Sequence, residues 1–135
     1  MKLLKIESIA DTVGIISSTI CVAHCILAPG LLIGGSVAPT LFMSEDLFHA
    51  AVLWFVLPSA MFAFAIGCQK HKDRIVYILG SIGVAGLIGS ALYFHELLGE
   101  TGERIATLIS AGLLIAAHIR NFRACRKGSC EHDQG

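Results

Sequence analysis

Charge is the property that this sequence has least of. Of its 135 residues, 15% are charged and 55% are apolar, and no fixed charge occurs between Asp11 and Glu45. Ten basic and ten acidic residues give a formal net charge of zero, so no basic surface for nucleic acid is expected. The chain has no phosphate-binding loop, dinucleotide fingerprint or nucleophile–base triad, so we do not expect an enzyme. A mean hydropathy of +0.74 indicates one small membrane domain rather than an ordinary soluble one.

The uncharged runs predict the fold class, an all-α integral membrane protein whose four transmembrane helices form a bundle. A helix needs about 20 apolar residues to cross the hydrocarbon core of a membrane. The first run is longer than one crossing, so we expect a bend or re-entrant piece after Pro29. The fourth run is short, so its charged ends must snorkel to the membrane surface. The four spans are predicted at about residues 12–30, 47–69, 75–95 and 102–121. They form a transmembrane domain at 1–122, followed by a Cys/His-containing tail at 123–135.

The basic residues predict the orientation of these spans. Nine of the ten lie on the same side as the two termini, and the exception is Arg104. Cytoplasmic loops are the ones enriched in lysine and arginine, so both termini should be cytoplasmic. A cleaved signal peptide is not expected, because Glu7 and Asp11 interrupt the basic start and the apolar stretch that follows exceeds 7–15 residues. The nine residues are Lys2, Lys5, Lys70, Lys72, Arg74, Arg120, Arg123, Arg126 and Lys127.

Two local patterns predict how the spans begin and pack. Asp11 precedes the first uncharged run and is expected to cap the N-terminus of its helix. In the third span, glycines recur every three residues at Gly80, Gly83, Gly86 and Gly89. Such a stripe allows another helix to pack closely.

Two thiols and an imidazole lie together in the first span, in the sequence Cys-Val-Ala-His-Cys at residues 21–25. On a helix, Cys21 and Cys25 share one face with their Cβ atoms roughly 5–6 Å apart, and His24 flanks that face. A metal–thiolate bond of about 2.3 Å lets one ion bridge both sulfurs, whereas a disulfide prefers Cβ atoms about 3.5–4.5 Å apart. Counted from Asp11, Cys21 lies about 15 Å along the helix, near the membrane midplane, where ionisable groups are usually functional. Cysteine is also a common small packing residue, but the combination favours a metal site.

Further candidate ligands lie towards both ends of the spans. Arg126 and Lys127 between the tail cysteines favour thiolate, and a reducing cytosol favours metal over disulfide there. The tail set is Cys125, Cys130 and His132. Possible relay ligands near the same side are Cys68, His71 and His118. On the opposite side, His49 and His95 accompany acidic residues that would concentrate cations, although solvated loop ends explain these residues nearly as well.

The chain resembles the MerC family of small inner-membrane mercury-resistance transporters. The similarity covers nearly the whole chain and includes Asp11-Thr12-Val13-Gly14, the Cys21–Cys25 motif with Pro29, His49, Pro58, His71, Glu103, Thr107, His118-Ile119-Arg120-Asn121 and the tail cysteines. The resemblance implies four spans that pass Hg²⁺ inward, with Cys21 and Cys25 as the membrane pair and Cys125 and Cys130 as the cytoplasmic pair. His24 between the membrane cysteines departs from the family pattern. Because imidazole suits zinc better than mercury, Zn²⁺ is an equal candidate.

The residues and the resemblance together favour a transporter or binding protein for one of these ions. The ion would enter past His49 and His95, bind at the membrane motif, and leave to the tail. Its partners would be membrane lipid, a periplasmic metal donor, a cytosolic thiol acceptor and a second copy of the chain in a homodimer. Two alternatives stay open: a four-helix redox protein that uses haem b or thiol–quinone chemistry, and an accessory subunit that binds metal without transporting it.

Overall fold

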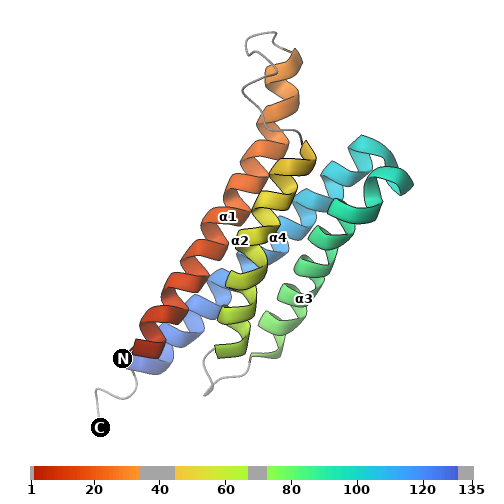
Figure 1. Cartoon of the computed structure of the whole chain (residues 1–135). Coiled ribbons are helices and arrows are strands. Elements are labelled where there is room, and N and C mark those ends of the chain that lie inside the picture. Colours follow the sequence, from red (N-terminus) through yellow and green to blue (C-terminus); the bar gives the residue numbers. More distant parts are fainter. Residues whose placement is uncertain (1, 34–44, 67–72, 131–135) are drawn as a thin grey trace.

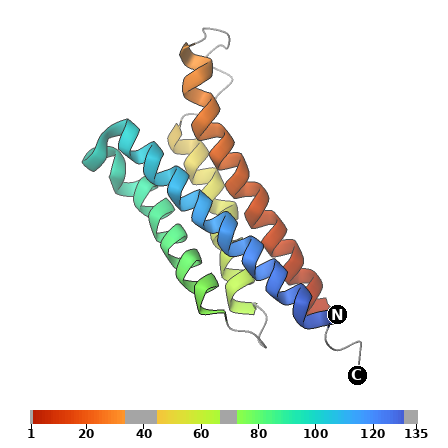
Figure 2. The same ribbon diagram turned by 180° about the vertical axis from the view of Figure 1, so that it is seen from behind.

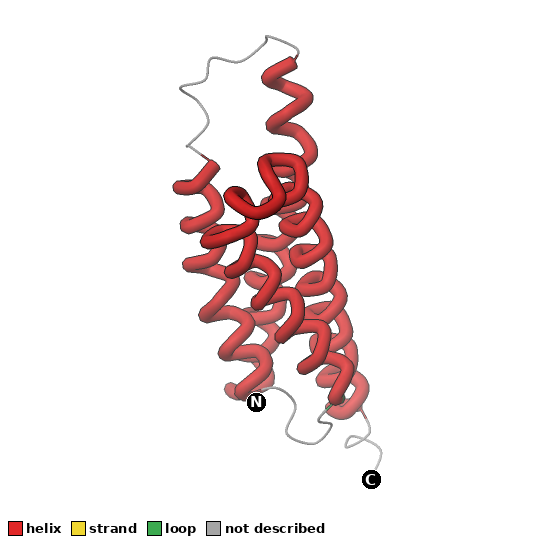
Figure 3. Tube along the Cα trace, turned by 90° about the vertical axis from the view of Figure 1, so that its right-hand side faces the viewer, coloured by secondary structure: helices red, strands yellow, loops and turns green. Residues whose placement is uncertain are grey.

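The computed structural model describes residues 2–33, 45–66 and 73–130, and every element in these ranges is a helix (Figures 1 and 3). In chain order they are α1 (Lys2–Ile33), α2 (Glu45–Ile66), α3 (Arg74–Gly89), the π-helix η2 (Ser90–Phe94) and α4 (His95–Cys130). The all-α prediction is confirmed. By length and composition, two stretches could cross a membrane, Ser8–Leu27 and Arg74–Ala124, while Ala50–Ala63 is a shorter apolar helix.

The helices run alternately up and down in an elongated bundle (Figures 1 and 2). α4 packs along both α1 and α3, and α2 packs along α1 with a smaller contact to α3. The start of α1 and the end of α4 therefore lie at the same end of the bundle (Figure 1). α4 shares the most extensive interfaces, so residues on its inner face can meet residues from the rest of the bundle.

The long stretch Arg74–Ala124 consists of two antiparallel legs. Asp73 caps its first turn, because its side chain accepts a hydrogen bond of 3.0 Å from the backbone N–H of Ile75. The direction reverses at Gly99, whose backbone has φ 68° and ψ 178°. That conformation is open almost only to glycine, so Gly99 allows α4 to return along α3.

Large apolar side chains cover the outside of the bundle. Trp54 and Met61 on α2 are 78% and 71% exposed, and isoleucines of α1, α3 and α4 also face outward. The interior instead contains polar groups. Soluble proteins rarely expose so much contiguous apolar surface, whereas polar groups in a membrane protein face the bundle interior. The distribution therefore matches a bundle surrounded by lipid.

The predicted glycine stripe of α3 packs closely against α4. A Cβ atom added at Gly83 would come within 2.7 Å of Leu114 Cγ, and one at Gly86 would overlap Ser110 Oγ. The absence of side chains at these positions lets the two backbones approach. Close packing of a neighbouring helix on the glycines is confirmed at Gly83 and Gly86.

Three expectations about helix ends differ from the structure. α1 begins at Lys2, so Asp11 lies inside the helix and is not its N-cap; that prediction was wrong. α1 also continues through Pro29 as far as Ile33, so the helix does not end at the proline. At the other end, α4 extends to Cys130, so residues 123–130 of the predicted tail are helical. The later part of the expected bend, residues 34–44, lies outside the described residues.

Candidate metal site

The inner face of α1 is a stripe of small and polar side chains. Its buried residues recur three or four apart, so they share one side of the helix: they are Asp11, Gly14, Ser18, Cys21 and Cys25. This stripe faces α4, the main packing partner of α1 along with α2. The most unusual buried groups of the protein are thus gathered along one interface.

Cys21 and Cys25 lie side by side within this interface, as their spacing predicted. Neither forms a disulfide, both are buried at 1% and 6% exposure, and the Cys21 side chain lies within hydrogen-bonding reach of Cys25. They form a buried cluster with Ala111 of α4, against which Val52 of α2 also packs. Ala111 is small, so it leaves the sulfurs close to one another without inserting between them.

His24 lies on the same turn but is only partly buried. Among the residues that the structure describes, no three His, Cys, Asp or Glu side chains gather closely enough to hold a metal ion. Cys21 and Cys25 therefore offer two sulfur ligands, and the participation of His24 stays a prediction.

A buried cluster of three polar side chains lies nearer the start of α1. His118 Nδ1 is 2.9 Å from Asp11 Oδ1, and Asn121 Nδ2 donates to Asp11 Oδ2 at 2.9 Å. Asn121 also donates to the Ala63 carbonyl of α2 at 3.4 Å. Asp11 and His118 are 1% and 0% exposed. We call Asp11, His118 and Asn121 the carboxylate cluster; it joins α1, α2 and α4.

Sequence reasoning missed the carboxylate cluster. The sequence predicts Asp11 as a helix cap and His118 as a possible relay ligand, but the structure places them against each other. A signal for this arrangement was available. Asp11, Gly14, Ser18 and Cys21 follow a helical repeat, which places Asp11 on the same face as the thiols.

At the opposite end of the bundle, a histidine and a glutamate form another pair. His95 Nδ1 lies 2.9 Å from Glu103 Oε2, with side-chain exposures of 70% and 9%. One turn apart on α4, Arg104 Nη2 and Glu100 Oε1 form an ion pair of 2.7 Å. His95 is therefore placed at the end of the bundle where the sequence predicted an acidic mouth, and its imidazole contacts a largely buried carboxylate.

The other predicted ligands fall outside the described side chains. His49, Cys125 and Cys130 lie in α2 and α4, but their side chains are not described. Cys68, His71 and His132 lie outside the described residues altogether. Their roles stay predictions.

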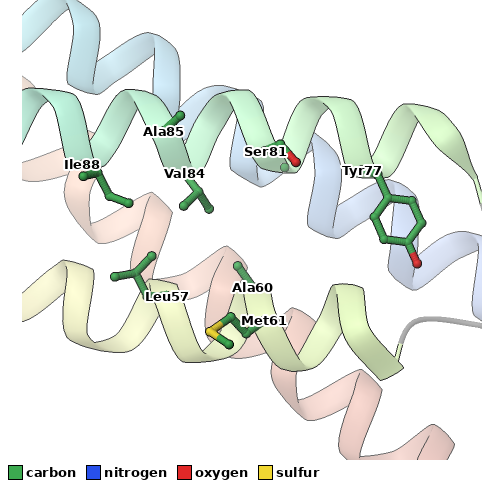
Figure 4. A pocket seen from close by; sticks show the side chains of 9 residues that line it. Leu57, Ala60, Met61, Tyr77, Ser81, Val84, Ala85 and Ile88 are labelled. Atoms are coloured by element: carbon green, nitrogen blue, oxygen red, sulfur yellow. The ribbon is translucent and has the colours of Figure 1, made fainter.

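An apolar groove between α2 and α3 is distinct from the thiol pair. It has a volume of about 550 Å³, and side chains such as Leu57, Met61, Val84 and Ile88 line it (Figure 4). None of its lining residues is a cysteine, histidine or carboxylate. The groove therefore offers no metal ligands and resembles the lipid-facing surface around it.

Comparisons with known proteins identify the family. Residues 11–123 match the family model described as MerC mercury resistance protein. Neither curated proteins nor solved structures give a match. The matched region contains the carboxylate cluster, the thiol pair and the outer His95–Glu103 pair. Since it also covers most of the chain, this protein belongs to the MerC family.

Proposed function

We propose that this protein carries a soft or borderline divalent metal ion, Hg²⁺ or Zn²⁺, across the bacterial inner membrane. The observation that carries the proposal is the pair of buried, adjacent thiols Cys21 and Cys25. MerC membership supports it, because the family is one of mercury-resistance membrane transport. Thiolates are the ligands that soft metal ions prefer.

Four membrane crossings are part of this proposal. The reversal at Gly99 would make two crossings of the stretch Arg74–Ala124. α2 has 22 residues, which at 1.5 Å per residue span about 33 Å, close to the roughly 30 Å hydrocarbon core. With α1, this gives four spans.

The charges at the bundle ends support a direction for the pathway. Lys5, Arg74 and Arg120 belong to the end where α1 and α3 begin and α4 approaches its last turns. Glu96 and Glu100 belong to the opposite end, near the reversal. The basic end would face the cytoplasm, so an ion attracted to the acidic end would pass the thiols on its way inward. His24 would assist at the thiols, and Cys125, Cys130 and His132 would receive the ion.

The proposal is tested with the Cys21→Ser/Cys25→Ser double variant in detergent. Metal analysis and titration with Hg²⁺ and Zn²⁺ should show that this variant binds one ion fewer, because hydroxyls replace the soft ligands at the pair while the tail ligands remain. Cys68→Ser removes a thiol elsewhere and should keep binding at the pair. Unchanged affinity and stoichiometry in the double variant would contradict the proposal.

Transport is tested separately in sealed vesicles that contain the purified protein. A carrier should admit the metal at a rate that depends on both cysteines. A protein that binds metal in detergent but gives no cysteine-dependent flux would be the accessory subunit instead.

A further inference from the structure

A small void lies beside Cys21, one of the two thiols of the pair. Its volume is about 10 Å³, close to the smallest cavity that holds one water molecule. Residues from all of the described helices line it, at the level of Cys21. Its lining residues are Cys21, Val52, Leu53, Leu87, Ser90, Ala91 and Thr107.

Ser90 is the unusual member of this wall. It is 3% exposed, and its hydroxyl has no hydrogen-bond partner within the described part of the chain. Serine hydroxyls inside helices ordinarily bond a carbonyl one turn earlier, as Ser59 does to Val56 at 2.9 Å and Ser110 does to Ala106 at 2.7 Å. Buried polar groups are nearly always satisfied, so the Ser90 hydroxyl calls for a ligand beyond those that the described residues supply.

The backbone at Ser90 departs from an ordinary helix in the same place. Ser90 is the first residue of the π-helix η2, which ends at Phe94. Such single π-turns inside helices are frequent at functional sites. The wider turn lies where α3 passes into the leg that leads to the reversal, and it coincides with the wall of the void.

A second oxygen faces the void from α4. Thr107 is 1% exposed, and its hydroxyl donates to the Glu103 carbonyl at 2.9 Å, so its oxygen lone pairs stay available as acceptors. The void thus brings together one sulfur and two hydroxyl oxygens, surrounded by apolar Val52, Leu53 and Leu87. A site of this size and composition fits one small cation.

We propose that Ser90 is an oxygen ligand for the transported ion, which occupies the void beside the Cys21 sulfur, with Cys25, the neighbour of Cys21 one turn along α1, as the second sulfur ligand. This inference rests on the proposed function and adds a ligand to it. Zn²⁺ and Cd²⁺ take four ligands in tetrahedral sites, whereas two thiolates suffice for Hg²⁺. Ser90 is therefore a residue that determines metal specificity, because it matters for zinc and cadmium and not for mercury.

The test compares Ser90→Ala with the matched control Ser59→Ala, whose hydroxyl is already bonded within its own helix. Affinities for Cd²⁺ and Hg²⁺ are measured from their thiolate absorption bands in detergent, and Zn²⁺ is measured by competition with Cd²⁺. Ser90→Ala should weaken Cd²⁺ and Zn²⁺ by roughly tenfold, the effect typical of removing one supporting ligand. Its Hg²⁺ affinity should stay that of the native protein, and Ser59→Ala should change none of the three.

A second substitution keeps the inference testable if the alanine variant folds poorly. Ser90→Cys places a third sulfur on the void, so it should tighten Cd²⁺ by at least tenfold and intensify the cadmium–thiolate band. Unchanged Cd²⁺ and Zn²⁺ affinities in Ser90→Ala, or equal losses for all three metals, would overturn the assignment. These outcomes differ from a failure of the proposed function. In that case the native protein itself would not bind Hg²⁺ at Cys21 and Cys25.

Discussion

The carboxylate cluster and the thiol pair lie along the same face of α1, but the buried oxygens near them differ in their hydrogen bonding. In the carboxylate cluster, both oxygens of Asp11 contact a nitrogen of α4, one from His118 and one from Asn121. Near the thiols, by contrast, the hydroxyls of Ser18 and Ser90 are buried without a partner in the described residues. The Asp11 carboxylate is satisfied by side chains of the protein itself, whereas these two hydroxyls are left for a ligand.

This difference separates a structural role from a binding role. Buried polar groups that bond one another fix how helices dock, because any other arrangement would strand them in an apolar interior. Buried groups without partners destabilise the fold until a ligand satisfies them. We infer that the carboxylate cluster holds α1, α2 and α4 in register, while the thiol level accepts the ion.

The largest effect on stability is expected for Asp11→Ala. It strands His118 and Asn121 in the interior, and breaking a buried pair of this kind costs about 3–5 kcal/mol. The measurement is the unfolding free energy in detergent, and Thr12→Ala is the control, since the Thr12 hydroxyl is exposed and bonds only Ser8 of its own helix. Equal stabilities of the two variants would show that the carboxylate cluster does not hold the bundle together.

A smaller effect is expected for Gly14→Ala, which tests how tightly α1 docks on the cluster. A Cβ atom at position 14 would overlap the His118 imidazole, which Asp11 prevents from moving aside. We expect a loss of about 1–3 kcal/mol, as for other overpacked sites. Gly112→Ala is the matched control on α4. Among the described residues, no atom beyond its immediate neighbours in the helix lies within 4 Å of its added Cβ, so it should gain up to about 1 kcal/mol from helix propensity.

The smallest effect concerns an exposed ion pair that joins the start of α3 to α4. The hydrogen bond from the Arg120 guanidinium, together with the Ile75 backbone N–H, holds the pKa of the Asp73 carboxyl below its ordinary value of 3.8. A lowered pKa in the folded state adds stability above pH 3.8, and this contribution is lost as the pH falls through the lower folded value. Arg120→Gln should therefore slightly reduce the loss of unfolding free energy between neutral and acid pH. The pH dependence of the unfolding free energy near pH 7 should stay the same. A curve identical to that of the native protein would show that the pair contributes nothing measurable.

The sequence predicted the parts of this fold that depend on local pattern. The adjacency of Cys21 and Cys25 followed from four-residue spacing on a helix, and the close approach of α3 and α4 followed from the glycine stripe. The all-α architecture followed from the uncharged runs. Each of these rests on one segment and its helical repeat, so no knowledge of the partner helix was needed.

The features that the sequence did not predict depend on which segments meet. Asp11 and His118 are 107 residues apart, so their contact requires the antiparallel docking of α1 and α4. The same holds for Ser90, which reaches the level of Cys21 only through packing of three other helices. The mistaken N-cap at Asp11 has a related cause, because an isolated acid before an apolar run is typical of a helix start and its buried partners were not visible.

The most direct test of the contrast between the two regions is to measure thermal unfolding of four proteins in detergent, with and without Hg²⁺. Each also carries Cys68→Ser, Cys125→Ser and Cys130→Ser, so that these thiols cannot bind Hg²⁺. The four are the otherwise native chain, Thr12→Ala, Asp11→Ala and Cys21→Ser/Cys25→Ser. A ligand at a hundred times its Kd stabilises the folded state by about 2.7 kcal/mol. Without metal, Asp11→Ala should have a lower unfolding midpoint than the native chain. When Hg²⁺ is added, this midpoint should still rise. The double cysteine variant should keep a near-native midpoint and show no rise. A double cysteine variant that still rises with Hg²⁺, or an Asp11→Ala protein as stable as Thr12→Ala, would contradict the account.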